Sequence, residues 1–338
     1  MKTIKLKILG AWSGTDFLLK ILEERYNVEL SEDPDYIIAS PLGGLYESVK
    51  YDGVRILFTG EPLVPDFNVF DYAIGFDYLT MMDAKGADRY CRYPLCFRDI
   101  ERVRLYSQGV TYCQAKEILQ AKKYFCNFIY GHQSARGERE TIFHMLERYK
   151  RVESAGSFMN NMPDGKIVPF NEEKIDFLRL CKFTVSCESI SYPGFVTEKV
   201  IDPFFAYSVP IYYGNPFIES EFNPEAMINL SGFSSIEEGI EKVKQIDQND
   251  EQYISMLMAP KLISEDYLDK LYEGLKEFLF RIFDQDRGDA YRRLRFYVQK
   301  HHEDCMREYM QIYNSPEYHI FKTRQRIGRK ISRSKKVY

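Results

Sequence analysis

Several features are scarce in this 338-residue chain, and each scarcity excludes a class of protein. No stretch approaches the roughly 20 consecutive apolar residues that a membrane-spanning helix needs. The seven cysteines are irregularly spaced and form no Cys-x-x-Cys pair, which argues against a disulfide framework or a zinc site and favours a reducing compartment. No Gly-x-Gly-x-x-Gly or Walker-type loop occurs, so a dinucleotide oxidoreductase or an ATPase is disfavoured.

Charge is distributed unevenly along the chain. Residues 322–338 hold eight Lys and Arg and no acid, so residues 1–321 carry −12, eight units below the whole-chain value of −4. A basic segment of this kind predicts contact with an anionic membrane surface, and a solvated, disordered tail is the alternative. Lysine alternates with apolar residues in Met1–Leu9, which predicts a strand and not a signal peptide. We therefore expect a cytoplasmic protein with peripheral contact at the inner face of a membrane.

The order of apolar segments predicts two α/β domains, as the length also suggests. A first series of expected elements comprises a helix at 15–26 and strands at 4–9, 36–39, 54–59 and 72–76. A second series comprises strands at 125–130, 151–157 and 182–187 and helices at 138–150, 171–180 and 236–247. The predicted fold is two Rossmann-like domains facing across a cleft, followed by a helical, basic tail. The predicted boundaries are 1–122, 123–285 and 286–338.

The segment Gly194–Pro216 is the most informative part of the sequence. It predicts a loop, a helix and then a buried strand that ends at a turn. Glu198 and Lys199 stand side by side where the helix would begin, and a helix start offers free N–H groups and a favourable dipole to an anion such as a diphosphate. Pro203 is unfavourable inside a helix, so we expect an irregular first turn and a regular helix from about Asp202.

This segment resembles the donor-binding signature of the α1,3-fucosyltransferases, which are inverting enzymes of the GT-B fold that use GDP-fucose. A second match, Phe58–Glu61 followed by residues 65–77, resembles the acceptor-domain signature of the same family. A third and looser match runs from Arg139 through Leu146 to Gly156 and Ser157. The matches occur in the order that the family shows and span both predicted domains.

The resemblance implies a role for individual residues. Glu61 would be the catalytic base, and Glu198 would accept hydrogen bonds from the ribose. Lys199 and Arg139 would bind the diphosphate, with Arg136 as the alternative to Arg139. The implied donor site consists of Arg139, Gly156, Ser157, Glu188, Ser189, Phe195, Val196, Thr197, Glu198 and Lys199, and the implied acceptor site of Trp12, Ser40 and Asp71. Trp12, the only tryptophan, would either stack on an acceptor sugar or serve packing.

Two positions depart from the pattern of the family. Ser189 stands where an Asn is usual, so a hydroxyl replaces an amide, and Phe195 stands where a Tyr is frequent, so a phenolic hydroxyl is lost. Each change predicts either weaker donor binding or a shifted preference for the nucleotide or the sugar. The class of enzyme is therefore better supported than fucose itself.

The expected partners are a nucleotide-sugar donor and a glycan acceptor, without nucleic acid. The Asp-x-Asp motifs Asp33–Asp35 and Asp284–Asp286 resemble a metal site of a different glycosyltransferase fold, but the first lies in the predicted acceptor domain and the second, at the end of the predicted donor domain, is an equally weak signal. We therefore expect no cofactor and no essential metal. The alternatives are transfer of another sugar from another nucleotide, a glycan- or nucleotide-binding protein without catalysis, and a membrane-surface scaffold. The presence of Glu61, Glu198 and Lys199 together argues against a non-catalytic protein.

Overall fold

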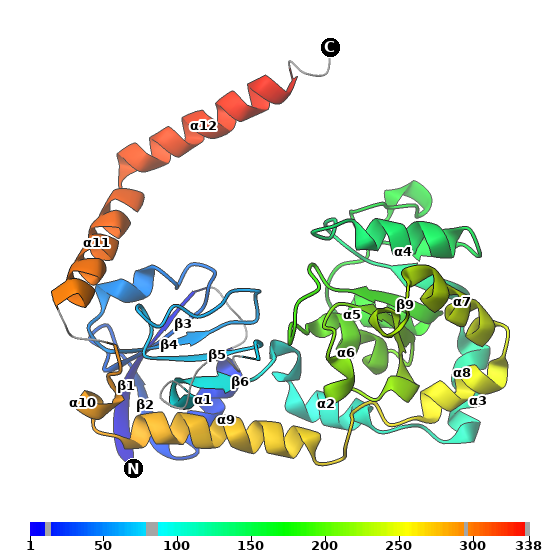
Figure 1. The fold of residues 1–338 in the computed structure, drawn as a ribbon, viewed down its shortest axis with the longest axis horizontal. Coiled ribbons are helices and arrows are strands. Elements are labelled where there is room, and N and C mark those ends of the chain that lie inside the picture. The colour runs from blue at the N-terminus through cyan, green and yellow to red at the C-terminus, as the bar shows by residue number, and fades with distance from the viewer. Residues whose placement is uncertain (11–14, 79–86, 294–296, 335–338) are drawn as a thin grey trace. The chain divides into compact units, whose positions relative to one another are not determined.

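The computed structural model describes residues 1–10, 15–78, 87–293 and 297–334. The chain forms two compact units, one of residues 1–74 and 279–338 and the other of residues 75–278. Each unit is built on a sheet (Figure 1). The predicted boundary after residue 122 falls between the last strand of one sheet and the first strand of the other. By contacts, however, residues 75–122 belong to the second unit.

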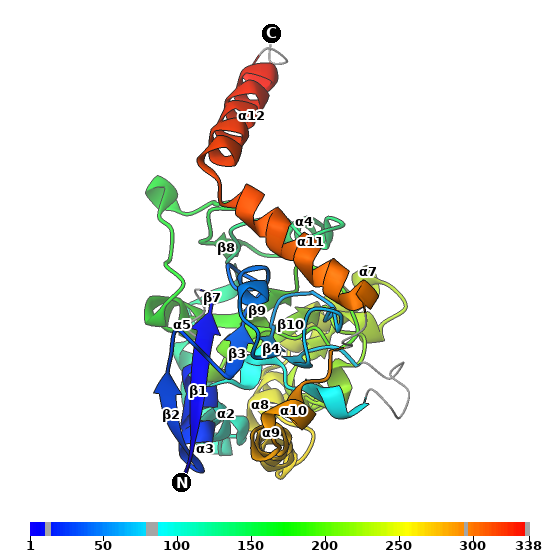
Figure 2. The same cartoon turned by 90° about the vertical axis from the view of Figure 1, so that its left-hand side faces the viewer.

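The first sheet has six strands in the order β2-β1-β3-β4-β5-β6, and β1 to β5 pair in parallel (Figure 2). Every residue of β3, β4 and β5 is buried, as expected for parallel strands covered on both faces. The helix α1 (Asp16–Glu23) turns Leu18, Ile21 and Leu22 into the core. The strands are β1 (Lys2–Leu9), β2 (Tyr26–Leu30), β3 (Tyr36–Ala39), β4 (Val54–Phe58), β5 (Tyr72–Gly75) and β6 (Tyr90–Arg92).

The second sheet is parallel, with the order β11-β10-β9-β7-β8. Its core is apolar and continuous, with the rings of Phe128 and Phe183 among its buried residues. The strands are β7 (Tyr124–Phe128), β8 (Val152–Ser154), β9 (Cys181–Cys187), β10 (Val209–Tyr213) and β11 (Ile228–Asn229). The helices are α2 (Ile100–Ser107), α3 (Tyr112–Ala121), α4 (Glu138–Glu147), α5 (Glu172–Arg179), α6 (Glu198–Phe205), α7 (Ile236–Asp247) and α8 (Asp250–Met258).

Helix α6 begins earlier than the sequence predicts. Thr197 is its N-cap, with extended backbone and a side chain that accepts a hydrogen bond from the Lys199 N–H. Pro203 lies inside the helix, and the expectation of a regular helix only from about Asp202 is wrong. Proline removes a single helical hydrogen bond, and four of the neighbouring side chains are buried in the core, so tertiary packing outweighs the local penalty. Glu198 and Lys199 consequently occupy the first turn.

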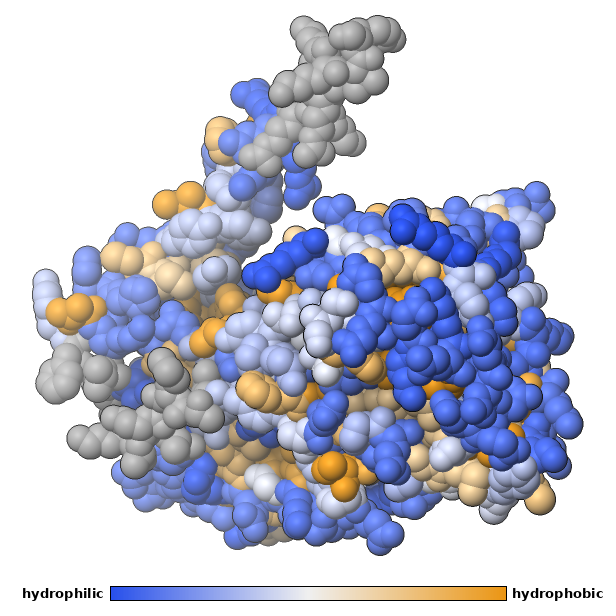
Figure 3. All heavy atoms as spheres, turned by 45° about the vertical axis from the view of Figure 1, so that its right-hand side comes forward, coloured by the Kyte–Doolittle hydropathy of each residue, from blue (hydrophilic) through white to orange (hydrophobic). Residues whose placement is uncertain are grey.

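The C-terminal segment adds four helices, of which all but the first part of α9 belong to the first unit. Phe283 of α9 packs against the rings of Tyr26 and Tyr36, and Arg307 of α11 donates to the carbonyl of Val49 at 2.8 Å. These helices are α9 (Tyr267–Asp284), α10 (Arg287–Ala290), α11 (Tyr297–Tyr313) and α12 (Pro316–Ser334). Within the described ranges no helix is both long and apolar enough to cross a membrane. On the face that Figure 3 shows, hydrophilic side chains dominate and hydrophobic ones are scattered.

Candidate functional site

The carboxyl ends of β7, β8, β9 and β10 lie along one edge of the second sheet, because these strands are parallel. Ligands of such sheets bind at this edge. The predicted donor residues follow three of the four strands: Gly156 and Ser157 follow β8, Glu188 and Ser189 follow β9, and Arg139 lies in the first turn of α4 after β7. The fold thus brings distant parts of the sequence to one edge, which we call the carboxyl edge.

The buried carboxylate of Glu188 binds the first residues of α6. It accepts hydrogen bonds from the backbone N–H of Thr197 at 2.9 Å and from the Thr197 hydroxyl at 2.8 and 3.0 Å. The Lys199 ammonium lies 3.4 Å from the same carboxylate and donates to the Thr197 hydroxyl at 2.9 Å. Burial raises the pKa of Glu188, and the charge of Lys199 opposes that rise. Glu188 therefore supports Thr197 and Lys199 from inside the protein.

Lys199 stays charged in this setting. Burial would lower its pKa, but the carboxylates of Glu188 and Glu198 outweigh burial, so the pKa of Lys199 is raised. The positive charge of Arg139 acts in the opposite direction on the same group. Arg139 in the first turn of α4 and Lys199 in the first turn of α6 are thus two neighbouring cations, each at a helix N-terminus, which is a favourable place for an anion.

Arg139 is almost fully buried, and its guanidinium is held by backbone carbonyls. Its Nε and Nη2 donate to the carbonyl of Cys187 at 3.2 and 3.1 Å, and Nη1 donates to the carbonyl of His132 at 2.8 Å. The guanidinium carbon lies 4.2 Å from the centre of the Tyr130 ring. Arg136, the alternative on sequence grounds, is exposed. Arg139 is thus fixed at the end of β9, beside Glu188.

The remaining donor residues divide into backbone and packing roles. A side chain at Gly156 would lie 2.2 Å from the carbonyl oxygen of Tyr130, so this glycine serves the close approach of two chain segments. Ser157 is exposed, and its hydroxyl lies 3.5 Å from the carbonyl of Gly131. Ser189 is exposed, and its carbonyl accepts from the N–H of Ala135 at 2.9 Å.

Phe195 and Val196, both predicted to contact the donor, are buried, with 3% and 1% of their surfaces exposed. The Phe195 ring packs edge-on against Phe76 at 5.2 Å between ring centres. Both are packing residues in this structure, and their contact with the donor stays a prediction. The loss of a tyrosine hydroxyl at position 195 is explained by this apolar surrounding.

Comparison with known proteins decides the family. Residues 9–98 match the family described as the alpha-(1,3)-fucosyltransferase FucT N-terminal domain. Residues 119–258 match glycosyltransferase family 10 (fucosyltransferase), C-terminal part. Together the two matches cover more than half of the chain. The chain belongs to the α1,3-fucosyltransferase family.

Individual relatives agree with this assignment. The chain is 28% identical over 315 residues to the alpha-(1,3)-fucosyltransferase FucT of Helicobacter pylori, covering 80% of this chain and 63% of the relative. It is 28% identical over 267 residues to the putative fucosyltransferase R654 of Acanthamoeba polyphaga mimivirus, covering 74% of this chain and 42% of that protein. The chain therefore spans less than two thirds of the length of either relative.

Solved structures show the same fold. A crystal structure of an alpha1,3-fucosyltransferase aligns with a TM-score of 0.64 and 26% identity, covering 82% of this chain and 90% of that chain. A GDP-fucose complex of an alpha1,3-fucosyltransferase aligns with a TM-score of 0.63 at 24% identity, covering 82% of this chain and 91% of that chain. Anabaena HepE with UDP-glucose, at 7% identity and a TM-score of 0.53, shares the fold alone and covers 84% of this chain and 100% of that chain. The predicted fold class, two α/β halves of the GT-B type with a helical C-terminal region, is confirmed.

The first unit carries the predicted base of this fucosyltransferase-family chain. Glu61 is exposed and follows β4 after Thr59 and Gly60. The Thr59 hydroxyl accepts from the Glu61 N–H at 3.1 Å and donates to the Glu61 carbonyl at 3.0 Å, which fixes the backbone of the turn. The N–H of Leu63 donates to the same carbonyl at 2.6 Å. Glu61 thus projects from an ordered turn at the carboxyl end of a strand.

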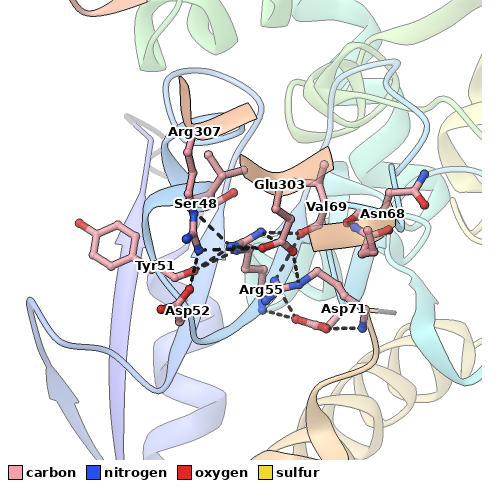
Figure 4. Close-up of polar contacts among 12 residues, drawn as sticks. Ser48, Tyr51, Asp52, Arg55, Asn68, Val69, Asp71, Glu303 and Arg307 are labelled. Atoms are coloured by element: carbon pink, nitrogen blue, oxygen red, sulfur yellow. Dashed lines mark hydrogen bonds and ion pairs between the residues drawn. The ribbon is translucent and has the colours of Figure 1, made fainter. Parts of the chain in front are cut away.

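The predicted acceptor residues are either buried or outside the described part of the chain. Trp12 lies outside the described residues. Ser40 is 1% exposed beneath Gly10, and a side chain at Gly10 would lie 2.1 Å from its hydroxyl. Asp71 is fully buried, and its two oxygens accept from the backbone N–H groups of Arg55, Arg292 and Arg293, each at 2.8 Å (Figure 4). Both side chains are thus enclosed in this structure, and their contact with an acceptor stays a prediction.

In each Asp-x-Asp motif one aspartate forms an ion pair with an arginine. Asp35 pairs with Arg287 at 2.7 Å, and Asp284 pairs with Arg25 at 2.8 Å. Among the residues that the structure describes, no group of three or more His, Cys, Asp or Glu side chains could hold a metal ion. A cavity of about 380 Å³ in the second unit, formed by α7, α8 and the turns around β11, contains none of the predicted site residues.

Sequence reasoning missed one charged pair at the site. Lys174 of α5 forms an ion pair with Asp202 of α6 at 2.7 Å, and both side chains are largely buried. With Lys199 and Asn127 they line a cavity of about 20 Å³ next to α6. The charge of Lys174 also acts on Glu198. A lysine in an amphipathic helix resembles a solvated residue in the sequence, so only its position in the fold identifies it.

The charges around Glu198 predict that the free energy of unfolding depends on pH in the acid range. Burial would raise its pKa, but Lys199 and Lys174 outweigh burial and lower the pKa to about 2, although more than half of the side chain is exposed. A depressed carboxyl pKa contributes stability above the ordinary value of 4.5, and this contribution is lost as the pH falls toward 2. We expect Glu198→Gln to reduce the free energy of unfolding at pH 7 and to change it less at pH 3, as measured by urea unfolding. Equal losses at both pH values would contradict this coupling, and Glu237→Gln, in the exposed first turn of α7, is the control.

Proposed function

We propose that this chain is an inverting glycosyltransferase that transfers L-fucose from GDP-β-L-fucose to a GlcNAc hydroxyl of an N-acetyllactosamine-like glycan, forming an α1,3 linkage. The observation that carries the proposal is the donor signature at the first turn of α6, in a chain of the α1,3-fucosyltransferase family. There Glu188, Thr197 and Lys199 form one hydrogen-bonded group, and Glu198 is ion-paired with Lys199 at 3.2 Å.

The donor half of the reaction requires neutralisation of a leaving diphosphate. Lys199 and Arg139 supply two positive charges, and the N-terminus of α6 supplies oriented N–H groups. Preorganised charge of this kind stabilises the negative charge that develops on the departing GDP. Glu198 accepts hydrogen bonds from the ribose hydroxyls. This arrangement needs no metal ion.

The acceptor half requires a base. Glu61 takes the proton of the acceptor hydroxyl while that oxygen forms a bond to the anomeric carbon of fucose. On the opposite face the bond from this carbon to the phosphate oxygen breaks, and its electron pair leaves with GDP. A single displacement converts the β-linked donor into an α-linked product. The ordered turn of Thr59, Gly60 and Glu61 supports this role.

The experiment measures GDP release from GDP-fucose with N-acetyllactosamine, with and without EDTA. We expect acceptor-dependent release that EDTA does not abolish, and little release from UDP-sugars. Lys199→Ala should raise the KM for GDP-fucose about tenfold or more, because a charge-assisted hydrogen bond contributes about 1.5–3 kcal/mol. Lys270→Ala, an exposed lysine of α9, is the matched control.

Each outcome of this assay separates the alternatives. GDP binding without release from GDP-fucose would favour another sugar or acceptor. Release from a UDP-sugar would favour another nucleotide donor. Tight binding of GDP with no turnover of any sugar would favour a non-catalytic nucleotide-binding protein. Absence of both binding and turnover would overturn the proposal.

We further propose peripheral contact with an anionic membrane through residues 322–338. Lys322, Arg324 and Arg326 of α12 are exposed, as are the apolar side chains of Phe321 and Ile327. Each basic residue near an anionic surface contributes about 1 kcal/mol, so the eight of this segment suffice for reversible attachment.

A further inference from the structure

A cluster of polar side chains holds the loop that leads into α6, and the donor signature does not include it. Arg92 is its centre, and all of its members belong to the second unit. The Nη2 of Arg92 donates to the Glu221 carboxylate at 2.6 Å and to the carbonyl of Gly194 at 3.2 Å. Its Nε donates to the carbonyl of Phe76 at 2.8 Å. One guanidinium thus joins three chain segments.

Glu221 completes the cluster. Only 2% of its side chain is exposed, and its two oxygens accept from the hydroxyls of Tyr78 at 3.0 Å and Tyr267 at 3.1 Å. The guanidinium carbon of Arg92 lies 4.0 Å from the centre of the Tyr78 ring. Burial would lower the pKa of Arg92, but the neighbouring carboxylate of Glu221 outweighs burial and the pKa of Arg92 is raised, so Arg92 stays charged.

The carbonyl that Arg92 binds belongs to a constrained residue. Gly194 has φ of +82°, and a side chain there would lie 2.4 Å from the carbonyl oxygen of Phe76. Its N–H donates to the Oδ1 of Asn215 at 2.8 Å, so both polar groups of its backbone are held. The Tyr192 hydroxyl, two residues earlier, donates to the Asp77 carboxylate at 3.1 Å. The N-cap Thr197 follows three residues after Gly194.

We propose that Arg92 and Glu221 are positioning residues for the nucleotide sugar, fixing the backbone at Gly194 and thereby the placement of Thr197, Glu198 and Lys199. This inference rests on the proposed function, since it concerns the same donor site. Stability alone does not require the pair, because packed apolar side chains often replace a buried ion pair without loss. The planar guanidinium adds direction, since it binds Glu221 and the carbonyls of Phe76 and Gly194 in a single geometry.

The test uses the full chain and compares Arg92→Lys and Glu221→Gln with the wild type. The KM for GDP-fucose, the KM for N-acetyllactosamine and the dissociation constant for GDP are measured, together with the melting temperature. We expect each variant to raise the donor KM and the GDP dissociation constant about tenfold, equivalent to about 1.4 kcal/mol, and to leave the acceptor KM within twofold. Lysine keeps the positive charge but lacks the planar set of N–H donors of the guanidinium, so Arg92→Lys should not retain the donor binding of the wild type.

Asp247→Asn is the matched control. Asp247 is a carboxylate of the second unit with 2% of its side chain exposed, and it pairs with Lys182 at 2.9 Å. This variant should lower the melting temperature and leave the donor KM unchanged. If Arg92→Lys and Glu221→Gln keep the wild-type donor KM and GDP affinity, or raise them no more than Asp247→Asn does, the inference is wrong.

Two further outcomes keep the test decisive. Should a variant of the ion pair fail to fold, Tyr78→Phe and Tyr267→Phe each remove one hydrogen bond to Glu221, and a donor KM equal to that of the wild type in both would also contradict the inference. Should the wild type bind GDP without turnover of GDP-fucose, the proposed function fails by itself. In that case the GDP dissociation constants of the same variants decide the inference.

Discussion

Glu61→Gln should lower the kcat of acceptor-dependent GDP release by about 100-fold or more, because general-base catalysis contributes about 10²–10⁴ to the rate. Glutamine has nearly the same size but cannot take the proton of the acceptor hydroxyl. Glu61 lies in the first unit and Lys199 in the second, so we expect the affinity for GDP to stay unchanged. Steady-state kinetics with GDP-fucose and N-acetyllactosamine, together with GDP titration, measures both quantities.

Glu47→Gln is the control for this variant, since Glu47 is a half-exposed acid of the same unit, in a short helical turn before β4. It should turn over at the wild-type rate. Wild-type kcat in Glu61→Gln would exclude Glu61 as the base. A loss of GDP affinity together with activity would indicate instead that Glu61 acts on the donor.

Asp71→Ala should destabilise the first unit by about 3–5 kcal/mol, a large part of the 5–15 kcal/mol that stabilises a typical domain. The change leaves the buried guanidinium of Arg293, 3.0 Å from Asp71, without this carboxylate, and three backbone N–H groups lose their acceptor. Glu303 of α11 is a second acid of the cluster, 3.4 Å from Arg55 and 3.2 Å from Arg293 (Figure 4). Burial and then Arg293 lower the pKa of Arg55 to about 10, which shows how closely the charges are packed.

Asp52→Ala is the matched control within the same cluster. Asp52 pairs with Arg307, but 83% of its side chain is exposed, so its removal should change the free energy of unfolding by about 0.5 kcal/mol or less. Urea unfolding monitored by tyrosine fluorescence measures both variants. An Asp71→Ala curve that coincides with that of the wild type would refute the anchoring role of Asp71.

Two truncations of the C-terminal segment should have different effects, because only the longer one removes residues of this cluster. Removal of residues 286–338 deletes Arg293, Glu303 and Arg307 and should unfold the first unit, as the Asp71 variant does in part. Removal of residues 322–338 deletes most of α12 but none of these three residues, and it should leave turnover in solution largely intact. The shorter deletion should abolish sedimentation with vesicles that contain anionic phosphatidylserine, while retained sedimentation would contradict the membrane proposal.

Local sequence patterns were sufficient for much of the fold. The strands Tyr36–Ala39, Val54–Phe58 and Tyr72–Gly75 are continuous apolar runs, as buried parallel strands require. The weaker elements were not predicted: the last four residues of β2 are all exposed or half-exposed, and β11 has only two residues. Propensity also misplaced the start of α6, because the penalty of Pro203 is local whereas the burial of Val200, Ile201 and Phe204 is tertiary.

The sequence by itself determined the family, the acid–base pair at the first turn of α6 and the turn that presents Glu61, because these features reside in contiguous residues. Only the tertiary structure decided which of the other predicted residues are buried and which are exposed. Phe195, Ser40 and Asp71 are buried, Arg92 donates to the carbonyl of Gly194, and the charge of Lys174 acts on Glu198. Burial and the pairing of charges depend on residues that lie far apart in the chain, and no local pattern records which of them will meet.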